Sequence, residues 1–307
     1  MLNPDRTIEN YKSATVKGLD KNSLPYRLYD IAKKFGVWNP KDIDFSKDKE
    51  DWKTLTPEEK ALIVRVCTLF VVGEESVTYD LVPLVFTMAK EGRTEEEMYL
   101  TTFLFEESKH VEFFRAFMEE VIGEELNQYD MGKIPGEGYG NIFYVELPRA
   151  MERLLTDSSP TAQVEAACTY NMVVEGILAE TGYHAFESAL KKRGQMPGLL
   201  EGISYTKRDE SRHIGYGQYL IQRHIAQDKS MWDVAQKRIE ALLPSAIDVV
   251  RNVFDGGKAE GVFGLKMEDF INFAMKQFQI RMDNLERALT RSVEEIYNMR
   301  EEEVGAF

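Results

Sequence analysis

Two four-residue segments repeat one pattern at separate places in the sequence: Glu107-Ser108-Lys109-His110 and Glu210-Ser211-Arg212-His213. Residues i and i+3 of an α-helix lie on the same face, so each segment can present a carboxylate oxygen and an imidazole nitrogen to one point. The chain contains four histidines in total. Either motif alone is a weak signal, because a glutamate three residues before a histidine also arises by chance.

Each motif follows an apolar segment that contains a further glutamate. Glu74 comes after Leu-Phe-Val-Val-Gly, and Glu175 comes after Asn-Met-Val-Val. A charged side chain on an apolar face is costly unless it is paired or bound to a metal. Two helical hairpins of this kind would assemble four carboxylates and two imidazoles, the ligand set of ferritin-like di-iron and di-manganese bundles. Hard oxygen ligands with imidazoles favour Fe and Mn over structural Zn. We therefore predict these metal ligands: Glu74, Glu107, His110, Glu175, Glu210 and His213. The alternative is that Glu107 and Glu210 face solvent and that the histidines belong to the core.

The remaining pattern predicts an all-α protein, with a ferritin-like four-helix bundle core and additional helices. Thr56-Pro57-Glu58-Glu59 has the N-cap, proline and glutamate of a helix start. Pro83 should bend the helix that follows. We expect helices at about 56–90, 94–123, 159–192, 199–225, 230–254 and 266–302, with a long crossover at 123–147. We predict one domain over 1–307, divided into an N-terminal arm (1–55), metal-binding helix pairs (56–225) and C-terminal helices (226–307).

The composition of the chain limits the classes of binding partner and the cellular compartment that we expect. The formal charge of −14 argues against nucleic acid, because phosphates would be repelled. No apolar run is long enough for a membrane span, so an integral membrane protein is not expected. The sequence begins without an apolar signal segment, and Cys67 and Cys168 lie in apolar stretches as expected for buried free thiols, so we predict a cytoplasmic protein. We expect His184 to pack near the bundle and His224 to be solvated.

The chain resembles the ribonucleotide reductase small-subunit superfamily over about residues 25–290. Trp38-Asn39-Pro40 resembles the segment that carries the electron-relay tryptophan of that family, and Asp209 matches its hydrogen-bonding aspartate. The resemblance implies that Glu74, Glu107 and His110 hold one metal. It also implies that Glu175, Glu210 and His213 hold the other, with Glu107 and Glu210 bridging.

One departure from the usual small subunit concerns its radical-bearing tyrosine, which lies four residues after the first histidine ligand. Phe114 takes that position here, which excludes a stable tyrosyl radical there. In addition, Glu74 stands where the usual subunit has aspartate. Both features occur in two groups with a mixed Mn/Fe centre: reductase subunits without the radical tyrosine, and ligand-binding oxidases that resemble the small subunit.

Val77 and Tyr170 favour the oxidases, which carry a valine–tyrosine ether crosslink beside the metals and bind a long-chain fatty acid. Val77 is three residues after Glu74, on the ligand face. Tyr170 precedes Glu175 by five residues, about 140° away around an ideal helix. Tyr170 would therefore reach the centre only through a distortion such as a π-bulge. The alternative is that Val77 and Tyr170 are ordinary core residues.

The function predicted from this resemblance is a dinuclear Mn/Fe carboxylate oxidase that uses O2 to oxidise a C–H bond. It would bind a long-chain fatty acid or similar apolar ligand, form the Val77–Tyr170 crosslink and assemble as a homodimer. Residues flanking the ligands could line an apolar tunnel or belong simply to the core: Phe70, Val71, Phe103, Phe113, Met172 and Val173. Trp38 and Asp209 would relay electrons. An Fe/Fe centre would use the same side chains.

Two alternatives remain at this point. One is a reductase small subunit lacking the radical tyrosine, although only ten residues follow Tyr297, which we expect to be too short for a docking tail. The other is a ferritin-like metal-binding protein without an organic substrate.

Overall fold

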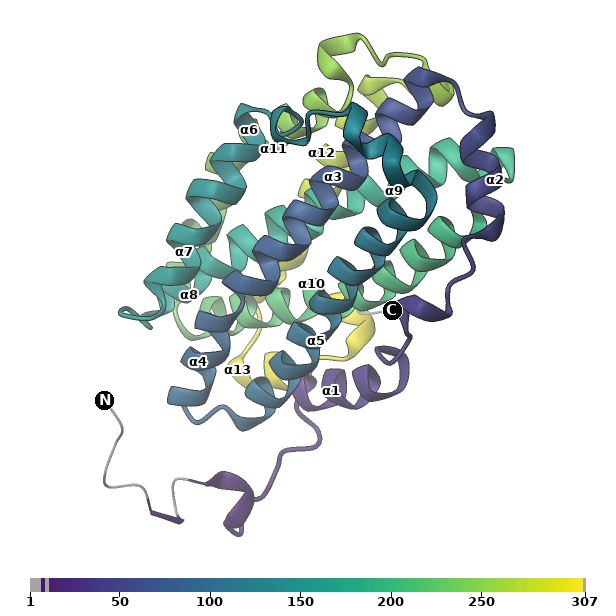
Figure 1. Cartoon of the computed structure of the whole chain (residues 1–307). Helices are drawn as coiled ribbons and strands as arrows, with labels where there is room; N and C mark the ends of the chain where they lie inside the picture. The colour runs from purple at the N-terminus through teal and green to yellow at the C-terminus, as the bar shows by residue number, and fades with distance from the viewer. Residues whose placement is uncertain (1–6, 9–10, 306–307) are drawn as a thin grey trace.

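The computed structural model describes residues 7–8 and 11–305, and within them the chain forms helices and turns without a β-strand (Figure 1). The α-helices are α1 (Leu24–Phe35), α2 (Ser46–Thr54), α3 (Pro57–Asp80), α4 (Val82–Lys90), α5 (Thr94–Phe117), α6 (Glu137–Gly140), α7 (Leu147–Arg153), α8 (Pro160–Ala167), α9 (Glu180–Leu190), α10 (Pro197–Gln227), α11 (Met231–Val253), α12 (Met267–Glu286) and α13 (Val293–Tyr297). The all-α fold class is therefore confirmed.

Three segments are π-helical, with one extra residue per hydrogen-bonded turn: η4 (Met118–Ile122), η7 (Asn141–Glu146) and η8 (Cys168–Ala179). Short 3₁₀ turns form most of the other connections: η2 (Lys12–Ala14), η3 (Pro40–Asp42), η5 (Gly123–Gln128), η6 (Met131–Lys133), η9 (Lys191–Arg193), η10 (Asp255–Gly257), η11 (Val262–Gly264), η12 (Arg287–Leu289) and η13 (Glu301–Val304).

Four long helical segments make the ferritin-like core. α3 packs against α5, the continuous segment α8–η8–α9 packs against α10, and α5 contacts α10 (Figure 1). α5 and α10 run antiparallel, because His110 lies opposite Asp209 and Glu96 lies opposite Arg223. α1 and α2 of the N-terminal arm pack on α5 and α10, and α11 and α12 cover η8.

Several helix boundaries differ from the prediction. The start at Thr56 is confirmed, with a complete capping box to Glu59. Pro83 does not bend one long helix: α3 ends at Asp80 and α4 starts anew at Val82, where Pro83 occupies the first turn and needs no hydrogen-bond partner. The last predicted helix is also divided, because Ser292 and Glu295 form a second capping box that begins α13.

The segment 123–147 is part of the connection that takes the chain from α5 to α8, as the predicted crossover requires, but it is largely helical. This segment contains η5, η6, α6 and η7, which lead into α7. Two of its aromatic side chains are buried. Phe143 is 7% exposed and Tyr139 is 2% exposed, and the Tyr139 hydroxyl donates to the backbone oxygen of Leu69 at 2.8 Å. The glycines and proline in this segment therefore separate short helices rather than mark a loop.

The two cysteines and the two histidines outside the motifs do not all have the burial that we predicted. Cys67 and Cys168 are buried free thiols, as expected. His184 stacks on Phe273 of α12 at 4.2 Å and so packs beside the bundle. The prediction for His224 was wrong: it is 4% exposed, and its Nε2 lies 3.0 Å from Oε1 of Gln163. None of the helices described here combines the length and the apolar character needed to cross a membrane.

Candidate metal centre

The six predicted ligands come from all four core segments and converge in the middle of the bundle. Glu74 lies on α3, Glu107 and His110 on α5, Glu175 in η8, and Glu210 and His213 on α10. The most exposed of them, Glu74, is only 5% exposed. Their ligand atoms form two groups, and within each group all atoms lie within 4.8 Å of one another. The first group is Glu74, Glu107, His110 and Glu210, and the second is Glu107, Glu175, Glu210 and His213. Glu107 and Glu210 therefore face both groups.

The imidazole Nδ1 atoms point at the carboxylates. Nδ1 of His213 is 3.1 Å from Oε1 of Glu107 and 3.5 Å from Oε2 of Glu210. Nδ1 of His110 is 3.5 Å from both Oε2 of Glu74 and Oε1 of Glu210. Each histidine thus offers the same nitrogen to its own group.

Several of these polar atoms have no hydrogen-bond partner among the described residues, although they are fully buried. They are both carboxylate oxygens of Glu107, Nδ1 of His110, Oε1 of Glu175, Oε2 of Glu210 and Nδ1 of His213. Unpartnered buried polar atoms are costly, so a cluster that converges on one space indicates a missing positive partner. Carboxylate oxygens with two imidazole nitrogens suit Mn and Fe, so the donor set fits a two-metal centre.

Burial acts to raise the pKa of each glutamate in the candidate centre. It raises the pKa of Glu74 to about 8, since desolvation disfavours the charged carboxylate. Burial and the neighbouring carboxylates also raise the pKa values of Glu175 and Glu210. Burial acts on Glu107 in the same way, but the adjacent imidazoles of His110 and His213 hold the pKa of Glu107 below its ordinary range. Without metal the site therefore retains protons, which a cation would displace.

A second layer of carboxylates lies behind the histidines. Nε2 of His213 is 2.8 Å from Oε2 of Glu106, and Nε2 of His110 is 3.4 Å from Oδ2 of Asp209. Arg212 donates to both carboxylates at 2.6 Å and so connects them. Such partners fix the orientation of an imidazole ligand and direct its other nitrogen toward the metal.

Of these three residues, only Asp209 was predicted from the sequence. A signal was present, since Glu106 directly precedes one candidate ligand and Arg212 directly precedes another. Adjacent positions on a helix differ by about 100°, so these side chains lie beside the ligand face rather than on it. Both are buried, at 1% exposure, which the sequence alone does not show.

Trp38 and Asp209 meet beside the first histidine, as the resemblance implied. Nε1 of Trp38 donates to Oδ2 of Asp209 at 2.7 Å, and the Trp38 ring stacks near His110 with centroids 6.3 Å apart. The ring of Tyr205 also stacks on Trp38, with centroids 5.4 Å apart. Lys109 also donates to Asp209, at 3.2 Å.

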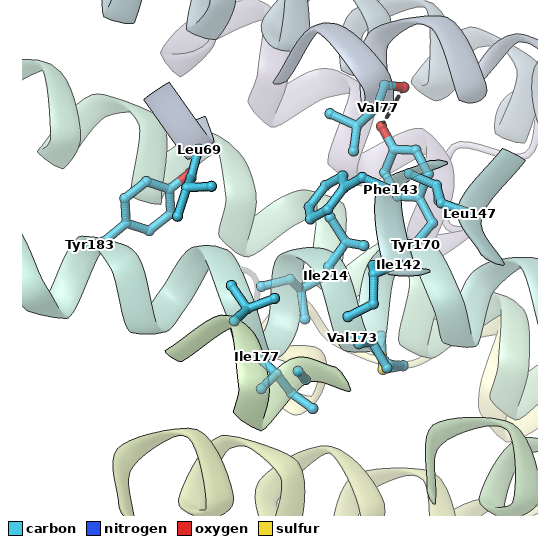
Figure 2. Close-up of a cluster of buried hydrophobic side chains, with 14 of the residues drawn as sticks. Leu69, Val77, Ile142, Phe143, Leu147, Tyr170, Val173, Ile177, Tyr183 and Ile214 are labelled. Atoms are coloured by element: carbon cyan, nitrogen blue, oxygen red, sulfur yellow. Dashed lines mark hydrogen bonds between the residues drawn. The ribbon is translucent and has the colours of Figure 1, made fainter. Parts of the chain in front are cut away.

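Val77 and Tyr170 lie next to each other (Figure 2). The hydroxyl of Tyr170 donates a hydrogen bond to the backbone oxygen of Val77 at 2.9 Å. Tyr170 belongs to the π-helix η8, so the predicted distortion of its helix is confirmed. In the same turn, Nδ2 of Asn171 donates to Oε2 of Glu175 at 2.9 Å.

An apolar cavity opens beside the candidate ligands, with an empty volume of about 780 Å³ that includes its open mouth. Glu74, Glu175 and Glu210 contribute to its wall, and the rest of the wall is almost entirely apolar. Phe70 is the one member of the predicted tunnel lining that contributes to this wall. The other five candidates do not line this cavity, which fits their alternative role in the core. The wall also uses distant segments: Tyr139, Phe143, Val249, Val250, Val253, Phe254 and Phe270.

Comparison with known proteins agrees with this geometry. The family model described as ribonucleotide reductase, small chain, matches residues 29–286. The chain belongs to this small-chain family. A solved R2-like ligand-binding oxidase, a valine-to-leucine variant with anaerobically reconstituted Mn/Fe cofactor, is 40% identical with a TM-score of 0.81, over 88% of this chain and 96% of its own.

Two further solved members of the family show the same likeness. A glutamate-to-aspartate variant of an R2-like ligand-binding oxidase, with aerobically reconstituted Mn/Fe cofactor, is 38% identical with a TM-score of 0.84. A tyrosine-to-phenylalanine variant prepared in the same way is 38% identical with a TM-score of 0.83. Each covers 92% of this chain and 98% of its own.

Proposed function

We propose that this protein is a ligand-binding oxidase with one Mn and one Fe ion, which uses O2 to oxidise a C–H bond. The observation that carries the proposal is the pair of buried ligand groups that share Glu107 and Glu210. The solved relatives hold a Mn/Fe cofactor, which supports this choice of metals over Fe/Fe. Glu74 and His110 would complete one site, and Glu175 and His213 the other.

When bound, such a centre supplies the electrons and the Lewis acidity for O2 reduction. The protein's own residues supply the rest. Glu107 and Glu210 compensate charge on both metals. Asp209 and Glu106 hold the imidazoles in place from behind, and the apolar wall excludes water from the reacting space.

The apolar cavity supports a long-chain fatty acid or a similar ligand. Its wall combines the carboxylates of Glu74 and Glu210 with aliphatic and aromatic side chains, and the cavity is open to solvent. An extended alkyl chain gains about 0.8 kcal/mol for each CH₂ removed from water, so this wall favours an apolar chain over a polar substrate. The C–H bond that is oxidised would lie at the carboxylate side.

The contact between Val77 and Tyr170 supports an ether crosslink. Formation of a C–O bond between them removes one hydrogen from the Val77 side chain and one from the Tyr170 hydroxyl, and O2 accepts both with their electrons. The solved relatives include variants at a valine and at a tyrosine. In those proteins the varied valine lies three residues after the varied glutamate, which is the spacing of Glu74 and Val77 here.

A homodimer in the cytoplasm completes the proposal. Tyr79, Val82 and Phe86 leave exposed apolar surface at the junction of α3 and α4, where a second copy would cover it. Cys67 and Cys168 are free thiols, as is usual in a reducing compartment. Light scattering of the purified protein tests the dimer, and a monomer at micromolar concentration would contradict it.

The central experiment combines metal analysis with ligand analysis. Protein loaded with Mn(II) and Fe(II), exposed to air and crystallised should show anomalous scattering from one Mn and one Fe at the two ligand groups. Organic extraction followed by mass spectrometry should release a long-chain acid. Replacing Ala179, which lines the cavity, by Trp should abolish the extractable ligand, whereas Ala61→Trp on the half-buried face of α3 outside the cavity should not. Two equal iron sites, or no apolar ligand in either protein, would contradict the proposal.

A further inference from the structure

A row of aromatic rings leads away from His213. Phe103 stacks on the His213 imidazole with centroids 3.6 Å apart, and Tyr99 follows 6.1 Å from Phe103. Tyr99 in turn lies 5.2 Å from Tyr216. The row therefore starts at the second candidate metal site, whereas the Trp38 contacts start at His110.

The row continues along α10 to the surface at α13. Tyr219 is 6.3 Å from Tyr216, and Tyr297 is 6.1 Å from Tyr219. Tyr99, Tyr216 and Tyr219 are at most 1% exposed, but Tyr297 is only half-buried. One end of the row thus contacts a candidate ligand and the other end is accessible from solvent.

Helix geometry explains why these rings meet. Tyr99 and Phe103 are four residues apart on α5, and His213, Tyr216 and Tyr219 are spaced by three on α10, so each set lies along one side of its helix. Since α5 and α10 are antiparallel and in contact, the two sets interleave. The row crosses the same helix pair that carries the two Glu-x-x-His motifs.

Packing alone does not explain the hydroxyl groups in this row. The hydroxyl of Tyr99 is fully buried and has no hydrogen-bond partner within residues 7–8 and 11–305. Phenylalanine would fill the same space without the cost of an unpaired hydroxyl. What a phenol adds to a phenylalanine ring is that it can be oxidised by one electron.

The hydroxyl of Tyr216 has a proton acceptor. It donates to Oε2 of Glu96 at 3.0 Å, and the other oxygen of Glu96 pairs with Arg223. Burial, with Glu96 nearby, raises the pKa of Tyr216 well above its ordinary value, so this phenol is neutral at rest. Its electron must therefore leave while the proton shifts toward the Glu96 carboxylate. At the surface, Arg93 donates to the Tyr297 oxygen at 3.0 Å and orients that ring.

We propose that Tyr99, Tyr216, Tyr219 and Tyr297 conduct single electrons from the surface at α13 to the metal centre, separately from Trp38. In each turnover of the route, one electron leaves a tyrosine for the O2-oxidised centre. The Tyr216 proton moves to Glu96, and the Tyr297 proton moves to water. An external one-electron donor of the thiol or ascorbate class then restores Tyr297, and the protons return. This inference rests on the proposed function, because the oxidised centre is the electron acceptor.

This route gives the protein a way to discharge an oxidised centre when no substrate is bound. Short steps between neighbouring rings carry an electron faster than one long step, because electron transfer slows steeply with distance. Tyr99 has no proton acceptor among the described residues, so it passes the electron without keeping a stable radical. The radical accumulates instead at Tyr297, whose proton passes to water.

The test uses Mn/Fe-loaded full-length protein mixed with O2 without a reductant. An O2 electrode measures consumption, freeze-quenched samples are examined by electron paramagnetic resonance, and a nitroso spin trap followed by peptide mass spectrometry locates the radical. In the wild type we expect a tyrosyl signal and an adduct on the peptide with Tyr297. Tyr216→Phe and Tyr219→Phe should each lower that adduct by at least about tenfold, with metal content and thermal stability checked in parallel. Tyr129→Phe, at a half-buried tyrosine outside the row, is the control and should leave the adduct unchanged.

Each result distinguishes this route from the proposed function. O2 consumption without an adduct at Tyr297 overturns the route alone. An undiminished Tyr297 adduct in a folded, metal-loaded Tyr216→Phe or Tyr219→Phe protein does the same, since Tyr297 would then be oxidised from solvent. A metal-loaded wild type that consumes no O2 overturns the proposed function, and the route with it.

Discussion

The hydroxyl of Tyr170 lies 2.9 Å from the backbone oxygen of Val77, although the two residues are 93 positions apart in the chain. The π-helix η8 makes this contact, because its extra residue rotates Tyr170 toward α3. A regular α-helix would place Tyr170 about 140° from the direction of Glu175. The local distortion therefore links the metal ligands to the pair proposed for the crosslink.

Aerobic metal loading should join Val77 to Tyr170. We expect tandem mass spectrometry to find one crosslinked peptide pair with a mass lower by two hydrogens, because the ether replaces a C–H and an O–H bond. Tyr170→Phe should abolish the product, since it lacks the oxygen, while both metals still bind. Anaerobic loading of the wild type is the control and should leave the peptides separate. Separate peptides after aerobic loading would contradict the crosslink.

Removing the shared ligand Glu107 should affect both metals, whereas removing Glu74 should affect one. Glu107→Gln is therefore expected to reduce bound metal from two ions to fewer than one per chain. Glu74→Gln should retain the site at Glu175 and His213. Elemental analysis after desalting measures both. Equal loss in the two variants would show that the metals are not arranged as proposed.

Glu106 and Asp209 provide a matched pair for testing the second layer, because each carboxylate lies behind one histidine. Glu106→Gln should weaken metal binding at the His213 site by about 10- to 100-fold. Asp209→Asn should act on the His110 site to a similar extent. Competition with a chelator of known affinity measures each loss. Equal loss of metal affinity at both sites in either variant would show that each carboxylate does not support one histidine.

Asp80 should make stability depend on pH in an unusual direction. Burial, with Glu152 nearby, raises the pKa of Asp80 from 3.8 to about 6. The folded state thus favours the protonated acid, whose stabilising effect is complete below pH 3.8 and is lost as pH rises through about 6. Asp80→Asn should therefore raise the free energy of unfolding by about 2 kcal/mol above pH 6 and have little effect near pH 4.

Asp157→Asn is the control for this measurement, because the pKa of Asp157 is lowered and its contribution does not change over the pH range in which that of Asp80 is lost. A backbone hydrogen bond from Ser159, together with its hydroxyl and Arg153, lowers the pKa of Asp157. Its contribution is present above the ordinary value of 3.8 and is lost as pH falls through the folded-state pKa. Urea denaturation of the wild type and the two variants from pH 4 to 8 measures the free energy of unfolding of each. A difference between Asp80→Asn and wild type that does not change with pH would contradict the prediction.

Removing the metals should strongly destabilise the protein, since cations compensate the buried carboxylates. At ligand concentrations 100 times the dissociation constant, binding adds about 2.7 kcal/mol to stability. The melting temperature should therefore fall on treatment with a chelator and recover with Mn(II) and Fe(II). Glu107→Gln should show a much smaller chelator effect. An unchanged melting temperature in the wild type would argue against metal binding at this centre.

The sequence by itself predicted the helical class and the six side chains that meet at the centre. Those predictions depended on local rules: capping at Thr56, the i, i+3 spacing of Glu107 and His110, and the apolar flanks of Glu74 and Glu175. Such patterns are readable because a helix determines which neighbours share a face, whatever surrounds it.

Only the tertiary structure decided the features that depend on distant segments. The burial of His224 against Gln163, the position of Glu106 behind His213 and the contribution of Val250 and Phe254 to the cavity all join parts of the chain that no local pattern relates. A helix distortion near Tyr170 was predicted from its spacing to Glu175, and the π-helix that provides it spans Cys168–Ala179. The physical reason is that burial and side-chain contact follow from the packing of whole helices, whereas spacing along one helix follows from the backbone alone.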